Sequence, residues 1–93
     1  MLDNKTVLIT GGTGSFGRNF AKYLIKNYNF KKLIIFSRDE LKQMQLKKEL
    51  ADQGNGRLRF FIGDVRDVDR LQRAFKGVDV VVHAAALKQV DTL

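Results

Sequence analysis

The chain has 93 residues and a formal net charge of +7, and it is 44% hydrophobic and 29% charged. This length allows one small domain with a modest core. The sequence contains no cysteine, which excludes disulfide bonds, a thiolate zinc site and a cysteine nucleophile. No apolar run approaches the roughly 20 residues of a membrane-spanning helix, and no metal site is predicted.

The excess of lysine and arginine raises the possibility of a polyanionic partner. These residues are scattered through KKL, KQMQLKKEL and RLQRAFK without interleaved aromatics, a pattern typical of solvated helix faces. We therefore expect no nucleic-acid partner and no membrane partner, and a phosphate-rich small molecule is the more economical anion. The first ten residues lack the pattern of a signal peptide, so a cytoplasmic location is expected.

Apolar, β-rich segments recur along the chain and are predicted to be strands: residues 6–10, 32–36, 58–62 and 78–86. The first, second and fourth are nearly continuous apolar runs, as a parallel sheet covered on both faces requires. Alternating strands and helices with short connections predict an α/β fold with a Rossmann-type doubly wound parallel sheet. Right-handed crossovers give the strand order 3-2-1-4, which places a ligand at the carboxyl ends of strands 1 and 4.

Three intervening segments carry apolar residues at helical spacing. The stripes are Phe20, Leu24 and Tyr28 in residues 17–28, Leu41, Met44 and Leu50 after residue 37, and Val68, Leu71 and Phe75 before residue 77. Asp67 is predicted to cap the third helix, and Gly77 lies just past it, where glycine is favoured.

A glycine cluster separates the first predicted strand from the first predicted helix. GTGSFG matches the G-x-G-x-x-G pattern, and the preceding glycine completes a G-x-x-G-x-x-G pattern. A strand before the motif and a helix after it are the context in which this motif binds a dinucleotide. A glycine-rich turn without a ligand is the alternative, whereas a Walker A loop is excluded because no Gly-Lys-Ser/Thr ends the motif.

Each residue of the cluster has an expected role at a bound pyrophosphate. Gly11 belongs to the tight turn, Gly14 lets the backbone approach the phosphates, and Gly17 lets the helix pack close to the sheet. Thr13 and Ser15 add hydroxyl donors. The positive end of the helix then faces the phosphates.

The choice between NAD and NADP depends on the residue about 20 positions past the glycines, where an NAD-binding fold has a carboxylate that binds the ribose. Here that place is occupied by Ser37 and Arg38. A hydroxyl and a guanidinium suit a 2′-phosphate, which a carboxylate would repel. The sequence therefore favours NADP.

Residues at the end of the second predicted strand and the start of the next helix leave alternatives open. Asp39 can turn toward a ribose, which would suit NAD. Ser37 and Glu40 match a capping box, so Ser37 can cap the second helix as well as contact phosphate. Lys42 either adds charge beside the same phosphate or is an ordinary solvated lysine.

The carboxyl ends of the third and fourth predicted strands supply further candidates. Asp64 and Val65 are expected at the adenine, with a carboxylate for the exocyclic amine and an apolar cover for the ring; a turn role for Asp64 is the alternative. The small residues of HAAALKQ leave room for a flat ring system. His83 is interpreted as structural, and Lys88 is placed to meet the cofactor ribose or a substrate phosphate.

Taken together, TGGTGSFG, IFSRDE, FIGDVRD and HAAALKQV resemble, in order and spacing, the extended short-chain dehydrogenase/reductases of the polysaccharide-biosynthesis (CapD-like) group. Within that group they are most similar to the inverting UDP-N-acetylglucosamine 4,6-dehydratases (PseB-like). The resemblance implies a tightly held NADP: hydride leaves sugar C4, water is eliminated across C5 and C6, and hydride returns to C6. It also implies a UDP-sugar substrate and a homo-oligomer. A related nucleotide-sugar epimerase or a non-catalytic NADP-binding module is the alternative.

The resemblance also implies individual site residues, of which Phe16, Glu40 and Leu41 rest on it alone. The implied cofactor contacts are Thr13, Gly14, Ser15, Phe16, Ser37, Arg38, Asp39, Glu40, Leu41, Lys42, Asp64, Val65, Ala84 and Lys88, with Lys88 also at the substrate. The sequence departs from the family at Asp91, where proline is frequent. No catalytic residue is predicted, because the Tyr-x-x-x-Lys motif of the family is expected downstream and the spacing of Tyr28 and Lys32 is interpreted as chance. Residues 1–93 are thus expected to be the N-terminal part of an NADP-binding Rossmann domain.

Overall fold

The computed structural model of the chain describes residues 3–11, 13–51 and 56–84. Strands and helices alternate throughout these residues. The elements are β1 (Thr6–Thr10), α1 (Ser15–Asn27), β2 (Lys32–Ser37), α2 (Glu40–Glu49), β3 (Leu58–Ile62), α3 (Val68–Phe75) and β4 (Val80–His83). The predicted strands and helices are therefore confirmed, with ends that shift by a few residues.

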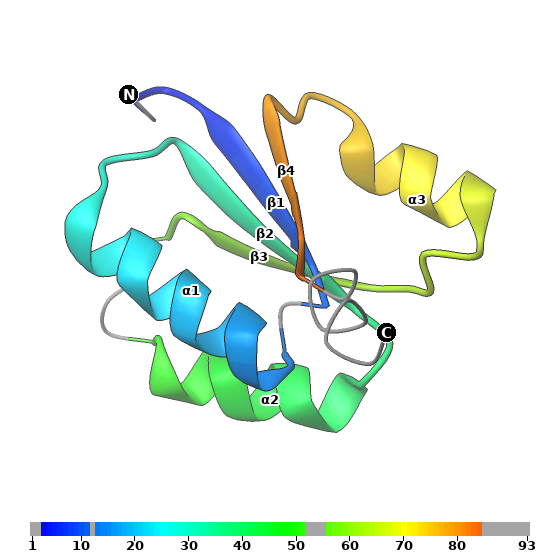
Figure 1. The fold of residues 1–93 in the computed structure, drawn as a ribbon, viewed down its shortest axis with the longest axis horizontal. Helices are drawn as coiled ribbons and strands as arrows, with labels where there is room; N and C mark the ends of the chain where they lie inside the picture. The colour runs from blue at the N-terminus through cyan, green and yellow to red at the C-terminus, as the bar shows by residue number, and fades with distance from the viewer. Residues whose placement is uncertain (1–2, 12, 52–55, 85–93) are drawn as a thin grey trace, which may run out of the picture.

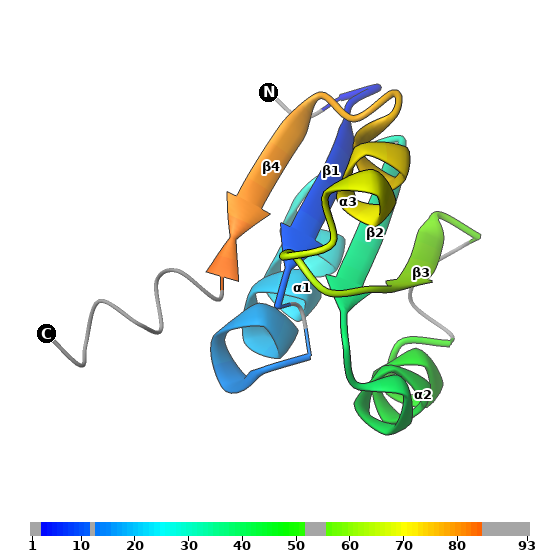
Figure 2. The ribbon, with the colours of Figure 1, turned by 90° about the vertical axis from the view of Figure 1, so that its right-hand side faces the viewer.

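The four strands form one parallel sheet in the order β3-β2-β1-β4, as predicted. Val7 of β1 lies beside Leu33 of β2 and Val80 of β4, so β1 is paired on both edges. Helices α1 and α2 cover one face of the sheet and α3 covers the other (Figure 1). Figure 2 shows these layers from the side. The architecture is the predicted doubly wound, Rossmann-like α/β sheet.

Strand β1 explains why a continuous apolar run predicts a central parallel strand. Val7 and Ile9 belong to the core beneath α1 and α2, whereas Leu8 packs with Phe36 and Ala74 on the α3 side. Successive side chains of a strand point to opposite faces, so both faces of β1 are buried.

The expectation that β4 is covered on both faces is wrong for the part of the chain that the structure describes. Val81 is 45% exposed, and His83 is also exposed. Among the described residues β4 pairs with β1 alone, and α3 leaves this part of its face open. An apolar run therefore identified the strand correctly but not its surroundings.

The predicted stripe of α2 is wrong at Leu41 and Met44 and is confirmed at Leu50, which is buried. Leu41 and Met44 are 65% and 53% exposed, while Gln43 and Leu46 face the core and Leu50 follows at the C-cap. The Gln43 amide nitrogen donates to the Ser37 hydroxyl at 2.9 Å and to the Phe61 carbonyl at 3.1 Å. These bonds tie α2 to the ends of β2 and β3, so a polar side chain occupies a core-facing position.

The other two helices differ from prediction in detail. In α1 the buried face is formed by Gly17, Ala21, Leu24 and Ile25, and Tyr28 lies at the C-cap, 37% exposed. In α3, Val68 and Phe75 are exposed, and Ala74 is the buried residue. Asp67 caps α3 as predicted, since its side chain accepts from the Arg70 backbone N–H, and Gly77 adopts φ +77°.

Gly63, directly after β3, has no room for a side chain. A Cβ there would lie 2.7 Å from Phe36 Cζ and 2.9 Å from Arg70 Cγ. Phe36 is fully buried and packs with Leu8 and Ala74, so a shift of its ring disturbs the core on this face. We expect Gly63→Ala to lower the free energy of unfolding by about 1–3 kcal/mol, measured by urea denaturation.

Gly14→Ala is the matched control for this overpacking. A Cβ at Gly14 meets only the Gly11 carbonyl oxygen, at an ordinary 3.5 Å. Its cost in stability is expected to be smaller than that of Gly63→Ala. Equal losses in the two variants would show that the Phe36 contact does not explain the need for glycine at position 63.

Candidate functional site

A cleft of about 760 Å³ opens at the carboxyl ends of the strands, where α1 also begins. Four segments that are distant in sequence meet there: the glycine turn, the end of β2, the turn after β3 and the end of β4. The lining residues are Gly11, Thr13, Gly14, Ser15, Phe16, Gly17, Phe36, Ser37, Arg38, Asp39, Lys42, Gly63, Asp64, Val65, Arg66 and Ala84. The cleft lies at the edge of the sheet where the strand order predicts a ligand.

The glycine turn joins β1 to α1 in a conformation that suits an anion. Gly11 has φ +68°, and its N–H donates to the Phe36 carbonyl at 2.8 Å, which fastens the turn to β2. Gly14 is the N-cap of α1 and forms no side-chain cap bond. The first N–H groups of a helix have no partner within it, so this end of α1 can donate to phosphate oxygens.

At the end of β2 the structure shows that Ser37, for which the sequence allowed both a helix-capping and a phosphate-binding role, does not cap α2. Ser37 is buried, and its hydroxyl accepts from Gln43. Asp39 is the N-cap of α2, because its Oδ1 accepts from the Lys42 backbone N–H at 3.0 Å. The predicted capping box of Ser37 and Glu40 is therefore wrong: α2 begins at Glu40, which places the cap at position 39.

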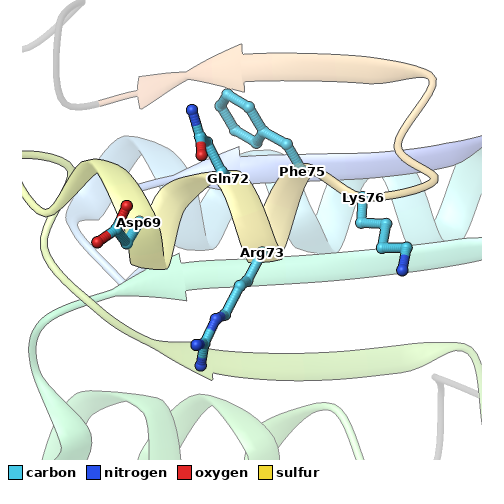
Figure 3. A pocket seen from close by; sticks show the side chains of 5 residues that line it. All are labelled: Asp69, Gln72, Arg73, Phe75 and Lys76. Carbon is cyan, nitrogen blue, oxygen red and sulfur yellow. The ribbon is translucent and has the colours of Figure 1, made fainter.

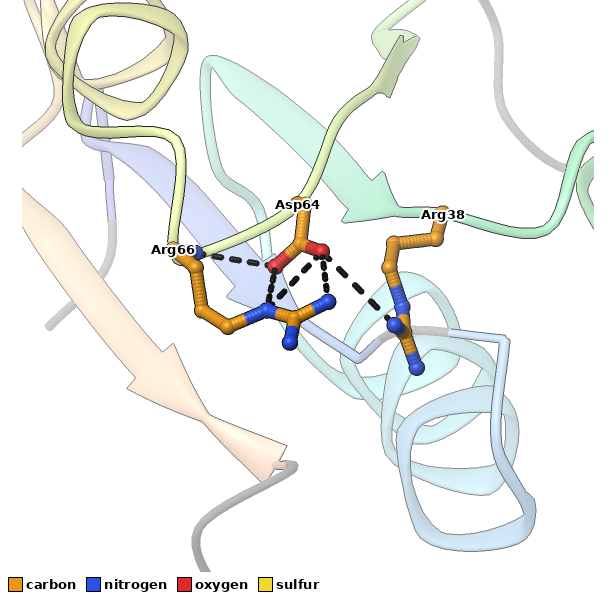
Figure 4. A network of polar contacts seen from close by, with 3 residues as sticks. All are labelled: Arg38, Asp64 and Arg66. Carbon is orange, nitrogen blue, oxygen red and sulfur yellow. Dashed lines mark hydrogen bonds and ion pairs between the residues drawn. The ribbon is translucent and has the colours of Figure 1, made fainter.

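Arg38, Asp64 and Arg66 line the cleft and form a charged network (Figure 4). Arg66 donates to both oxygens of Asp64, with its Nη2 2.7 Å from Oδ2, and Arg38 Nη1 lies 3.6 Å from the same oxygen. The hydrogen bonds from Arg66 lower the pKa of Asp64 to about 2, so it is a carboxylate at neutral pH. Asp64 also accepts from the Arg66 backbone N–H, which is the turn role that the sequence left open.

Most of the predicted binding residues come together in this cleft. Glu40 and Leu41 do not, because they lie exposed on the first turn of α2 outside the lining. Lys88 lies outside the described residues. The residues that line the cleft without having been predicted are Phe36, Gly63 and Arg66. A glycine directly after an apolar strand was the available signal for Gly63, and Arg66 stands two residues after the predicted Asp64.

His83 does not line the cleft. Its Nδ1 is in hydrogen-bond contact with the hydroxyl of Thr10, its neighbour in the register of β1 and β4. This contact supports the structural interpretation of His83. Within residues 3–11, 13–51 and 56–84 no group of histidine and acidic side chains could hold a metal ion.

A second hollow of about 550 Å³ lies on α3, lined by Asp69, Gln72, Arg73, Phe75 and Lys76 (Figure 3). Its side chains are mostly charged and exposed, and none belongs to the glycine turn or to the end of β2. It is thus separate from the cleft. No helix among the described residues is long and apolar enough to cross a membrane.

Comparison with known proteins identifies the family. The sequence model of the polysaccharide biosynthesis protein family matches residues 7–93. The chain belongs to this family. The family resemblance inferred from the four motifs is thereby confirmed, and the other comparisons say which members and folds are similar.

Within this family, the chain is similar to two kinds of curated enzyme. It is 54% identical over 91 residues to the UDP-N-acetylglucosamine 4,6-dehydratase (inverting) of Campylobacter jejuni, covering 97% of this chain and 26% of the relative. It is 50% identical to the UDP-glucose 4-epimerase of Rickettsia bellii, covering 99% of this chain and 27% of the relative. The chain thus spans about a quarter of the length of the curated relatives it matches.

Solved structures of related proteins have the same fold as this chain. Pen from Bacillus thuringiensis superposes with a TM-score of 0.78 at 34% identity, covering 87% of this chain and 24% of that protein. The dTDP-glucose 4,6-dehydratase of Bacillus anthracis, solved in complex with NAD, gives a TM-score of 0.72 at 27% identity, covering 85% of this chain and 26% of that protein. A short-chain type dehydrogenase/reductase from Mycobacterium ulcerans gives 0.74 at 26% identity, covering 88% of this chain and 32% of that protein.

Proposed function

We propose that residues 1–93 form the N-terminal part of an NADP-binding Rossmann domain. The protein they belong to is then an NADP-dependent, inverting UDP-N-acetylglucosamine 4,6-dehydratase of polysaccharide biosynthesis. The observation that carries the cofactor proposal is the meeting of the glycine turn and Arg38 at one cleft. The 54% identity to the Campylobacter jejuni dehydratase supports the substrate class.

The residues at the cleft fit the parts of the nucleotide in order. The first N–H groups of α1 suit the pyrophosphate, because they have no partner within the helix, and Thr13 and Ser15 line the cleft beside them. Arg38 suits the 2′-phosphate, because its side chain is 70% exposed and a guanidinium offers paired donors to phosphate oxygens. Val65 lines the cleft and offers an apolar surface that suits the adenine ring. The nucleotide, when bound, would supply the hydride transfer to and from the sugar.

The remaining site residues of the proposal are predictions from the sequence, and Phe16, Glu40 and Leu41 rest on the resemblance alone. Glu40, Leu41 and Lys88 stay predicted contacts, as do the roles of Phe16 and Ala84 at the edge of the cofactor. A homo-oligomer and a cytoplasmic location are likewise predictions. What this chain contributes to the proposed reaction is the holding and orientation of the cofactor.

A nucleotide-sugar epimerase of the same group is the second candidate. The 50% identity to the Rickettsia bellii UDP-glucose 4-epimerase favours it, over nearly the same residues as the dehydratase match. The glycine turn and the end of β2 do not distinguish the two candidates, because nearly the whole chain matches both relatives. The discrimination therefore requires an assay of product rather than of binding.

A chimera tests the proposal directly. Residues 1–93 replace the matched N-terminal segment of the Campylobacter jejuni dehydratase, with a parallel chimera in the Rickettsia bellii epimerase. We expect the dehydratase chimera to form a 4-keto-6-deoxy sugar nucleotide and to bind NADPH more tightly than NADH. Equal affinity for the two nucleotides would contradict the cofactor proposal. Activity of the epimerase chimera alone would favour the second candidate.

A further inference from the structure

The Asp64 carboxylate, which lines the cleft, contacts two guanidinium groups, those of Arg66 and Arg38, at unequal distances (Figure 4). Its Oδ1 accepts from the Arg66 backbone N–H at 2.9 Å and from Arg66 Nε at 3.2 Å. Its Oδ2 accepts from Arg66 Nε at 3.1 Å and Nη2 at 2.7 Å. Arg38 Nη1 stands 3.6 Å from Oδ2, which is an ion pair without a hydrogen bond.

The backbone keeps the Asp64 carboxylate in place independently of the Arg66 side chain. The Arg66 N–H donates to Oδ1, and the Asp67 N–H donates to the Asp64 carbonyl at 2.9 Å. The Asp64 side chain is 27% exposed, whereas the side chains of Arg38 and Arg66 are 70% and 79% exposed. A change at the Arg66 guanidinium therefore leaves a fixed carboxylate facing Arg38.

A carboxylate beside Arg38 opposes the binding of a phosphate. It would take the donors of Arg38 for itself and would repel the phosphate charge. The other charged groups that line the cleft are Asp39 and Lys42, and the Asp39 carboxylate is engaged at the N-terminus of α2. Of the cations lining the cleft, Arg66 is therefore the one that is bidentate on Asp64 and cancels its charge.

We propose that Arg66 is a positioning residue for cofactor specificity: it acts as the counter-ion of Asp64 and thereby leaves Arg38 available to a 2′-phosphate. The cleft then prefers a nucleotide with a phosphate on the adenosine ribose through a chain of three residues, of which only Arg38 touches that phosphate. This inference rests on the proposed NADP function. It adds a residue that none of the sequence motifs had marked as a binding position.

The test compares NADPH and NADH binding to the 93-residue chain by isothermal titration calorimetry. Arg66→Gln is expected to lower the ratio of the two affinities about fivefold, through weaker NADPH binding, because the ion pairs concerned are exposed. Arg66→Lys keeps the charge and should retain part of the ratio. Arg73→Gln makes the same charge change on α3, outside the cleft, and should leave the ratio unchanged.

A double substitution separates positioning from direct contact. In Asp64→Asn with Arg66→Gln, the carboxylate that needed a counter-ion is gone, so the ratio should return to within about twofold of the unmodified chain. A ratio that stays low would overturn the proposal, because Arg66 would then touch the phosphate itself. An unmodified chain without NADPH preference would instead defeat the proposed NADP function. A clear preference that Arg66→Gln leaves intact would defeat the role of Arg66 alone.

Discussion

Replacement of Arg38 by aspartate is expected to reverse the cofactor preference of this chain. The guanidinium is exposed at the mouth of the cleft and holds only a 3.6 Å ion pair with Asp64, so its donors are available to a 2′-phosphate. Loss of a charge-assisted pair costs about 1.5–3 kcal/mol, and the new carboxylate adds repulsion. NADPH affinity should therefore fall about 100-fold. NADH affinity should change little or rise, because a carboxylate at the end of this strand suits ribose hydroxyls.

Isothermal titration calorimetry with both nucleotides measures this reversal. Arg73→Asp is the matched control, since it makes the same charge change on α3 outside the cleft. A similar loss of NADPH affinity in the control would show that the net charge of the chain, rather than Arg38, attracts the nucleotide. An unaltered NADPH to NADH ratio in Arg38→Asp would show that the 2′-phosphate binds elsewhere.

The sheet was predictable because few arrangements satisfy its apolar segments. Val7, Leu8 and Ile9 are consecutive, apolar and buried, as is typical of a central strand of a parallel sheet. Short connections and right-handed crossovers leave few orders of four parallel strands, and the glycine motif after the first strand is typical of the order 3-2-1-4. The strand order followed from these constraints without knowledge of any side-chain contact.

The faces of the helices were less predictable, and α2 shows why. A count of apolar residues placed Leu41 and Met44 against the core, but Gln43 lies there instead. The Ser37 hydroxyl and the Phe61 carbonyl at the strand ends accept from the Gln43 amide, which satisfies this buried polar side chain. Hydrophobic periodicity takes no account of such acceptors, since they exist only after β2 and β3 are paired.

In the site, too, features set by neighbouring residues were predictable, whereas contacts between distant segments were not. The turn geometry of Gly11 is a property of neighbouring residues, so a motif of local sequence could predict it. The pairing of Arg66 with Asp64 depends on the turn after β3, and its effect depends on Arg38 from the end of β2. Two residues from one turn and one from another strand form no sequence motif, which is why Arg66 was not predicted.

Substitution of Gly14 by serine is expected to separate folding from cofactor binding. Gly14 is the N-cap of α1 with φ −72° and ψ 172°, which any residue can adopt, and no side chain caps the helix there. Serine is a better N-cap than glycine by a few tenths of a kcal/mol, so the free energy of unfolding should rise slightly. Its Cβ and hydroxyl would stand where a pyrophosphate approaches the backbone. Binding of both nucleotides should fall about 30-fold, because overpacking at a close contact costs about 1–3 kcal/mol.

Gly14→Ala tests the two parts of this argument separately. It adds the same Cβ without the hydroxyl, so it should weaken binding as Gly14→Ser does without the gain in stability. Urea denaturation measures the stability and calorimetry the affinities. Because the pyrophosphate is common to both nucleotides, the NADPH to NADH ratio should stay unchanged in both variants, in contrast to Arg38→Asp. Unchanged affinities in both variants would mean that the phosphates do not approach Gly14, and the glycine cluster would then serve only the turn from β1 to α1.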